Sequence, residues 1–117
     1  MIYLASPYSH PDPQVKQQRF EQVCKVAAQL MRQDRVVFCP IAHTHPMDKY
    51  VPQGENTHGF WLRQDFEFLQ LCSDLYIVTL DGWKESKGLQ AEVALAKTLH
   101  IPIVLLTPDG DYVCPED

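Results

Sequence analysis

Four short apolar runs, separated by stretches of helical periodicity, constrain the fold of this chain more than any other feature. The runs occupy residues 2–5, 36–39, 75–80 and 102–106. Apolar runs of this length are typical of strands that are buried on both faces of a sheet. Strands that alternate with helices form parallel sheets with helices on both faces. We therefore expect an α/β fold, a small flavodoxin-like or Rossmann-like three-layer sandwich with a parallel sheet of about four to five strands.

The segments between these runs predict three helices, at about residues 13–34, 57–72 and 89–99. In the first, apolar residues recur at spacings of three and four, as they do on one face of a helix. Asn56 or Thr57 is a candidate N-cap for the second. Because crossovers between parallel strands are right-handed, we expect a small doubly wound sheet. For this sheet we expect the strand order 2-1-3-4. The loops after the first and third strands would then face one crevice.

The segment 40–58 is expected to be a long irregular loop, since it contains several prolines and a glycine. Long loops in compact domains are usually functional or mobile. His43 and His45, with His58 at the end of the loop, suggest a metal site at first sight. Metal sites need three or four ligands in a fixed geometry, and this spacing matches no metal-binding pattern. We favour a loop that faces the ligand, with His43 as a substrate-binding residue and no metal.

The charge and length of the chain bear on its partners and its organisation. The 117 residues carry a formal net charge of -5 and no cluster of Lys or Arg, so we expect no nucleic-acid partner. No apolar run approaches the roughly 20 residues that span a bilayer, so we expect no membrane partner. The N-terminus lacks the features of a signal peptide. The length suits a single domain over residues 1–117, and a hydrophobic fraction of 45% argues against disorder.

Four cysteines are spread along the chain: Cys24, Cys39, Cys72 and Cys114. They form no C-x-x-C pair and no zinc-binding pattern. We expect free thiols in the reducing cytoplasm, with the first three in or near the core. The expected location is therefore cytoplasmic.

Residues 81–92 form the motif that carries most functional information. They follow the third apolar run, and ligands of open α/β sheets bind where the chain leaves the carboxyl end of a strand. Gly88 and Glu92 are one helical turn apart, and Gly88 has no side chain to fill the space beside the Glu92 carboxylate. A helical glutamate is ordinarily exposed to solvent. The small residues around Glu92, together with Gly88, favour a pocket instead.

Further polar and aromatic residues are candidates for the same crevice. Asp65 is either a solvated helix acid or a second carboxylate, and two carboxyl groups can divide a glycosyl transfer between nucleophilic attack and proton transfer. Ser86 either caps the third helix or donates to a ligand oxygen, and these two roles are compatible. Tyr8, Trp61 or Trp83 would be able to stack on a nucleobase. The two loops bring these residues to the crevice: Ser6, Pro7, Tyr8, Asp81, Trp83 and Ser86.

Several common reaction types have no motif in this chain. There is no G-x-S-x-G nucleophile elbow, no G-x-x-x-x-G-K-[ST] phosphate loop, and no G-x-G-x-x-G after the first strand. ATP hydrolysis and ordinary dinucleotide oxidoreduction are therefore disfavoured.

Taken together, these segments resemble the nucleoside 2-deoxyribosyltransferase superfamily, and most of all its small uncharacterised branch, the DUF1937 family. The resemblance rests on YLASPY at residues 3–8, on Asp65 and Asp74, and on D-G-W-x-x-S-x-G-x-x-x-E-x-x-x-A at residues 81–96. It covers nearly the whole chain. It implies a flavodoxin-like parallel sheet and assembly into a homo-oligomer, a dimer or a tetramer.

The resemblance also implies roles for individual residues. In characterised relatives a glutamate in the position of Glu92 attacks the anomeric carbon, and an aspartate in the position of Asp65 serves the nucleobase as proton donor or hydrogen-bond partner. A tyrosine in the position of Tyr3 orients the nucleophile, whereas from the pattern alone a tyrosine in a strand is a core residue. Relatives that hydrolyse nucleoside 5'-monophosphates have a serine where Ser86 stands, and those that act on free nucleosides usually have an acid. This favours a phosphorylated substrate, although the loop at residues 6–10 lacks the arginine of phosphate-using relatives.

We therefore expect an N-glycosidase or N-glycosyltransferase that acts on a nucleoside or a nucleoside 5'-monophosphate. The reaction would pass through a covalent glycosyl intermediate on Glu92 and would need no cofactor. One alternative is a nucleotide-binding or sensing module on the same fold, without turnover. Another is an NAD-type glycohydrolase that uses the same glutamate.

Overall fold

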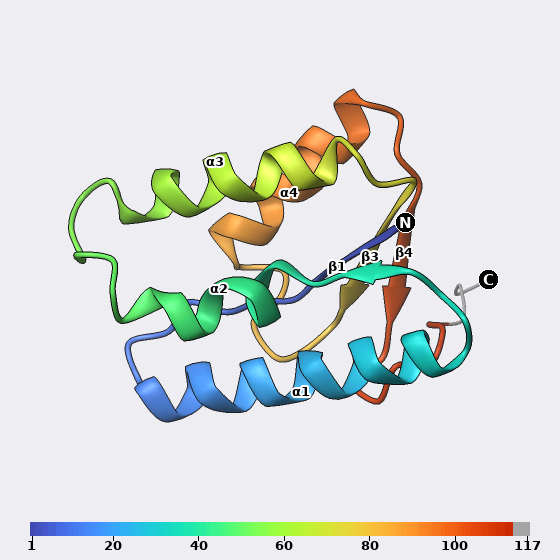
Figure 1. The fold of residues 1–117 in the computed structure, drawn as a ribbon, viewed down its shortest axis with the longest axis horizontal. Coiled ribbons are helices and arrows are strands. Elements are labelled where there is room, and N and C mark those ends of the chain that lie inside the picture. Colours follow the sequence, from blue (N-terminus) through green and yellow to red (C-terminus); the bar gives the residue numbers. More distant parts are fainter. Residues whose placement is uncertain (114–117) are drawn as a thin grey trace.

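The computed structural model of the chain describes residues 1–113, which form an α/β sandwich (Figure 1). Strands and helices alternate in this part of the chain, except that two helices follow the second strand. In order, the elements are β1 (Ile2–Ala5), α1 (Pro13–Arg32), β2 (Val37–Phe38), α2 (Pro40–Asp48), α3 (Thr57–Leu69), β3 (Asp74–Val78), α4 (Lys87–Thr98) and β4 (Ile103–Leu106).

The four strands form one sheet in the order β2-β1-β3-β4, and all neighbouring pairs are parallel. Ile2 is paired with Val37 of β2 on one side and with Asp74 of β3 on the other, so β1 is an inner strand of the sheet. In Figure 1, α1 lies below the sheet, and α3 and α4 lie above it. The predicted fold class and strand order are therefore confirmed: the fold is a three-layer α/β sandwich with a parallel sheet.

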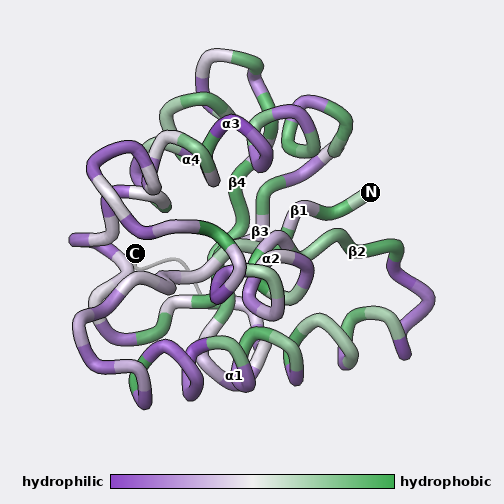
Figure 2. The backbone as a smooth tube through the Cα atoms, turned by 60° about the vertical axis from the view of Figure 1, so that its left-hand side comes forward, coloured by the Kyte–Doolittle hydropathy of each residue, from purple (hydrophilic) through white to green (hydrophobic). Residues whose placement is uncertain are grey.

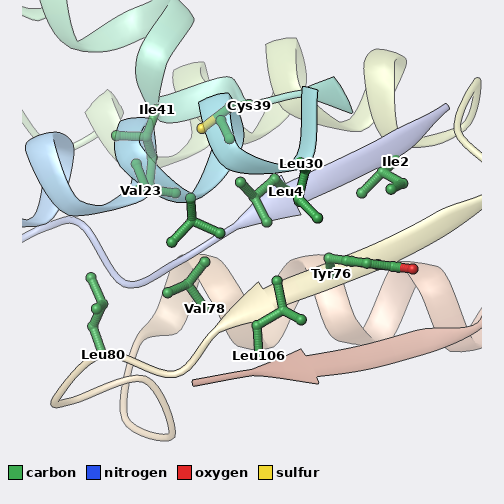
Figure 3. Packing of buried hydrophobic residues seen from close by; sticks show 12 residues of the cluster. Ile2, Leu4, Val23, Leu30, Cys39, Ile41, Tyr76, Val78, Leu80 and Leu106 are labelled. Atoms are coloured by element: carbon green, nitrogen blue, oxygen red, sulfur yellow. The ribbon is translucent and has the colours of Figure 1, made fainter. Parts of the chain in front are cut away.

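The two faces of the sheet carry two separate apolar clusters, because side chains alternate along each strand. The cluster between the sheet and α1 is shown in Figure 3 and includes Ile2, Leu4, Tyr76, Val78, Leu106, Val23 and Leu30. The cluster beneath α3 and α4 includes Tyr3, Ala5, Leu75, Ile77, Leu69, Leu89 and Ala96. Truncation of a fully buried leucine such as Leu75 to alanine would cost about 2–5 kcal/mol.

Local signals fix the ends of α1. The Asp12 side chain accepts a hydrogen bond from the backbone N–H of Gln14 at 2.9 Å, and Pro13 occupies the first helical position, where an N–H is not needed. Hydrophilic and hydrophobic residues alternate along the helix (Figure 2), as they must when one face packs on the sheet. The helix ends at Arg32, two residues earlier than expected, because the chain reverses at Asp34 with a φ of 63°.

The expectation of an irregular loop over residues 40–58 is wrong for its first half, which forms α2. Pro40 begins the helix without cost, since the first turn leaves its N–H groups free in any case. Pro46 lies inside the helix and removes one of its hydrogen bonds. Pro40 and Ile41 are buried, and Ile41 belongs to the cluster under α1. This packing outweighs the cost of Pro46.

The other boundaries differ from the expected ones by one to three residues. α3 ends at Leu69 rather than near residue 72, and β3 ends at Val78 because the N–H of Leu80 turns back to the Val78 carbonyl at 2.9 Å. After β4 the chain turns at residues 108–110 as expected, with Gly110 at a φ of 91°. The rest of the predicted acidic tail, residues 114–117, lies outside the described residues.

Cys24, Cys39 and Cys72 are free cysteines, of which Cys39 and Cys72 are buried and Cys24 is half-buried. Burial raises the pKa of the Cys39 thiol to about 12, which disfavours the thiolate form. Cys114 is outside the described residues. Within residues 1–113, none of the helices has both the length and the apolar character needed to cross a membrane.

Candidate active site

A cavity of about 560 Å³ lies at the carboxyl end of β1. Its wall is formed by the loop after β1, by the first turn of α1, by α2, by residues 53–55 of the α2–α3 loop, and by the N-terminal parts of α3 and α4, as far as Asp65 and Glu92. Ligands of open parallel sheets bind at this edge, and the volume is within the usual range for small-molecule sites. The predicted position of the binding crevice therefore coincides with a cavity.

Glu92 lies in α4 on the cavity wall and is buried, with 6% of its surface exposed. The hydroxyl of Tyr3, on the inner strand β1, donates a hydrogen bond to Oε2 of Glu92. Gly88 lines the cavity one turn earlier, and a Cβ at this position would meet only Cε1 of His58, at 3.8 Å. Because Gly88 has no side chain, the space beside the Glu92 carboxyl group stays open to the cavity on this side.

Burial controls the protonation of Glu92. The pKa of Glu92 is raised from the usual 4.5 to about 8: loss of solvent raises it most, the hydrogen bond from Tyr3 lowers it, and the nearby charge of Asp65 raises it again. The pKa of Tyr3 is raised well above its usual value, first by burial and then by the Glu92 charge. At neutral pH the Tyr3–Glu92 pair is therefore mostly uncharged, and only a minority of molecules carry the Glu92 carboxylate.

Asp65 lines the same cavity from α3. Burial raises the pKa of Asp65 from the usual 3.8 to about 6. The charge of Asp65 in turn raises the pKa of Glu92, although less than burial does. Two carboxyl groups whose pKa values are both raised, on one cavity wall, are a common arrangement for acid–base and nucleophilic chemistry.

Five of the predicted substrate-binding residues also line the cavity: Ser6, Tyr8, Trp61, Ser86 and Gly88. Ser86 caps α4, since its hydroxyl oxygen accepts a hydrogen bond from the backbone N–H of Leu89 at 3.3 Å. Its own hydroxyl proton remains able to reach a ligand. Pro7 is fully buried behind the lining rather than on it, and the hydroxyl of Ser6 donates to the Pro7 carbonyl at 3.3 Å.

Three other predicted residues lie outside the cavity wall: His43, Asp81 and Trp83. His43 is exposed and its ring packs near the rings of Phe38 and Phe68. Trp83 packs against the cluster beneath α3 and α4. The structure therefore does not bring the whole of the two loops to one crevice.

Asp81 contributes its main chain to a different contact. The guanidinium of Arg19 donates to the carbonyl of Asp81 and to the carbonyl of Ser9, each at 3.0 Å. One side chain thus ties the loop after β1 to the loop after β3. Gly82 next to it has a φ of 88°, which turns the chain away after β3.

Sequence reasoning missed several polar residues of the wall. Lys16 of α1 and Asp48 of α2 form an ion pair at 3.0 Å, and both residues line the cavity. Thr44 and His58 line it as well. Lys16 belongs to the polar face of α1, which would ordinarily be solvent-exposed. Lys16 could have been predicted as a wall residue from its place in the first turn of α1, because that turn lies at the same edge of the sheet as the cavity.

The histidines considered for a metal site have three different surroundings. His45 stacks on Phe20 at a centroid distance of 4.0 Å, His43 is exposed, and His58 lines the cavity. Across residues 1–113, His, Cys, Asp and Glu side chains nowhere gather in a group of three that could hold a metal ion.

The fold and the cavity define a small doubly wound α/β protein with a buried glutamate, hydrogen-bonded to a tyrosine, at the carboxyl edge of its sheet. The chain belongs to the family described as domain of unknown function (DUF1937), whose sequence profile matches residues 1–107. The family named from the sequence is therefore confirmed. No curated protein matches the chain.

Proposed function

We propose that the protein is an N-glycosidase or N-glycosyltransferase that acts on a nucleoside or a nucleoside 5'-monophosphate. The observation that carries this proposal is the buried Glu92 carboxyl group, which accepts from Tyr3 and shares the cavity with Asp65. A carboxylate in a site of low polarity is strongly attracted to the positive charge that develops on a sugar ring as its glycosidic bond breaks. The resemblance to nucleoside 2-deoxyribosyltransferases supports the same chemistry.

The reaction proceeds in two steps. A carboxylate oxygen of Glu92 attacks C1' of the sugar, while the electrons of the C1'–N bond move to the nucleobase, which takes a proton from Asp65. Water or a second base then attacks C1', the bond from C1' to Glu92 breaks, and the Asp65 carboxylate accepts the released proton. Tyr3 holds the glutamate in position and, by donating to it, favours the ionised form.

One observation favours a second candidate, a nucleotide-binding module without turnover. With a pKa of about 8, Glu92 is mostly protonated at neutral pH, and a protonated carboxyl group is a hydrogen-bond donor rather than a nucleophile. A binding module would use Glu92 to donate to an acceptor atom of the ligand.

A product screen separates the two candidates. The purified chain is incubated with deoxynucleosides, ribonucleosides, their 5'-monophosphates and NAD, with and without a second free base, and products are identified by chromatography and mass spectrometry. We expect base release that is lost in Glu92→Gln and retained in Glu67→Gln, an exposed acid of α3. A melting shift from one ligand without product would favour the binding module. Base release that persists in Glu92→Gln would refute the role of Glu92.

A further inference from the structure

The ion pair between Lys16 and Asp48 is a charged feature of the cavity wall that the proposed reaction does not use. Lys16 Nζ lies 3.0 Å from Asp48 Oδ2, and the two side chains are 26% and 19% exposed. No other ion pair occurs within residues 1–113. It joins α1 to α2 at the wall, so any ligand that fills this part of the cavity meets both charges.

The position of Lys16 is fixed by a chain of contacts on its other side. Its ammonium group lies 5.0 Å from the centroid of the Tyr8 ring, a cation–π contact. The Tyr8 hydroxyl is 2.6 Å from Nδ1 of His45, and Nε2 of His45 is 3.0 Å from the amide oxygen of Gln17. An amide oxygen only accepts, so Nε2 carries the proton and Nδ1 accepts from Tyr8. The Tyr8 ring is therefore held against Lys16.

The remaining charges of the wall disfavour an anionic ligand. Among residues 1–113, five carboxyl groups but only two lysines line the cavity, and with Glu92 uncharged at neutral pH the carboxylates still outnumber the lysines by four to two. One of these lysines, Lys16, already has Asp48 as its partner. A phosphate group that approached Lys16 would have to displace this carboxylate or lie beside it. Displacement costs the attraction between Lys16 and Asp48, and a position beside Asp48 costs free energy through repulsion between like charges. A sugar hydroxyl, in contrast, is able to accept from Lys16 and donate to Asp48 at the same time.

We propose that Asp48 is a built-in counter-ion that occupies the place at Lys16 where an anionic group of a ligand would otherwise bind. The cavity then selects ligands that are uncharged and hydroxyl-bearing at this end. Combined with the proposed function, on which this step rests, Asp48 makes the enzyme prefer an unphosphorylated nucleoside over the corresponding 5'-monophosphate.

Inorganic phosphate is the probe that tests the role of Asp48 directly. In Asp48→Asn the side chain keeps its size and loses its charge, which leaves Lys16 without its anionic partner. We expect the phosphate affinity of this variant, measured by isothermal titration at pH 7, to exceed that of the wild type about tenfold. Adding Lys16→Met to the variant should remove the gain. Glu55→Gln, which removes a carboxylate from the same wall but uncovers no lysine, should change the affinity by less than about twofold.

Three results would overturn the proposal: no gain in Asp48→Asn, an equal gain in Glu55→Gln, or a gain that survives Lys16→Met. Asp48→Ser carries the same expectation and serves if the asparagine variant does not fold. The substrate preference is then measured with thymidine and thymidine 5'-monophosphate in a Glu92→Gln background, where Asp48→Asn should shift relative binding about tenfold toward the monophosphate. The phosphate titration needs no turnover, so it decides the role of Asp48 even if the glycosyl chemistry of Glu92 is refuted.

Discussion

Replacement of Glu92 by glutamine should make the protein more stable at alkaline pH, because the folded state holds this carboxyl group in a place that disfavours its charge. Glutamine has the same shape, and its carbonyl oxygen is able to accept the hydrogen bond of Tyr3. The amide cannot ionise. The variant therefore keeps the packing of α4 and removes the titration.

The magnitude follows from the pKa of Glu92 in the two states. The pKa is about 8 in the folded protein and 4.5 in the unfolded chain, so within this range the folded state binds more protons. The contribution of Glu92 to stability is fully present below pH 4.5 and is lost as the pH rises through 8. With about 1.4 kcal/mol for each pKa unit, the loss between pH 5 and pH 9 amounts to about 4 kcal/mol. This is a large share of the roughly 5–15 kcal/mol that stabilises a domain.

Urea unfolding at pH 5 and pH 9, followed by tryptophan fluorescence, measures this loss. Other groups titrate in the same range, but they do so in both proteins, so the difference between wild type and Glu92→Gln isolates position 92. Glu67→Gln removes an exposed glutamate of α3 and should follow the wild type at both pH values. If the unfolding free energies of Glu92→Gln and wild type change in parallel within about 1 kcal/mol, the burial argument for Glu92 is wrong.

Three further predictions concern the rate of base release and the stability of α4. The reaction needs Glu92, with a pKa of about 8, to be ionised and Asp65, with a pKa of about 6, to be protonated. The rate should rise up to about pH 6 as Glu92 ionises, stay level up to about pH 8 because the loss of the Asp65 proton offsets further ionisation, and fall above pH 8 because only that loss continues. Asp65→Asn should abolish the alkaline fall, and a fall that remains would exclude Asp65 as the acid. Tyr3→Phe removes a hydrogen bond that lowers the pKa of Glu92, so kcat/KM at pH 7 should drop about tenfold, and an unchanged value would count against Tyr3 as a positioning residue. Ser86→Ala removes the cap on the N–H of Leu89 and should lower the unfolding free energy by about 1 kcal/mol in urea titrations, whereas no change would show that the cap is dispensable.

The sheet was predictable because apolar clusters cover both of its faces. Strands of such a sheet are apolar almost without interruption, and β1, β3 and β4 show this pattern apart from Asp74 at the start of β3. The helix α2 was not predictable, since its prolines indicate a loop in any local analysis. Only the burial of Pro40 and Ile41, the second of them in the cluster between the sheet and α1, explains why a helix with an internal Pro46 forms.

The site was predictable to a smaller extent. Gly88 and Glu92 could be placed on one helix face from their spacing, but the burial of Glu92 depends on Tyr3, which is 89 residues away in the sequence. The wall residues Lys16 and Asp48 escaped sequence reasoning for the same reason. Lys16 has an ordinary position on the polar side of α1, and Asp48 falls in a segment whose prolines indicate a loop. Only the meeting of α1 with α2 brings the two residues to the cavity.

Arg19 ties the loops after β1 and β3 through two main-chain carbonyls, so the side chains of Ser9 and Asp81 take no part in the link. Substitutions at positions 9 and 81 therefore leave the two hydrogen bonds of Arg19 intact. A lysine at position 19 would not replace the arginine, because a single ammonium group lacks the planar fork that reaches two acceptors at once. Among related chains that keep this link, we expect an unvarying arginine next to freely changing partners.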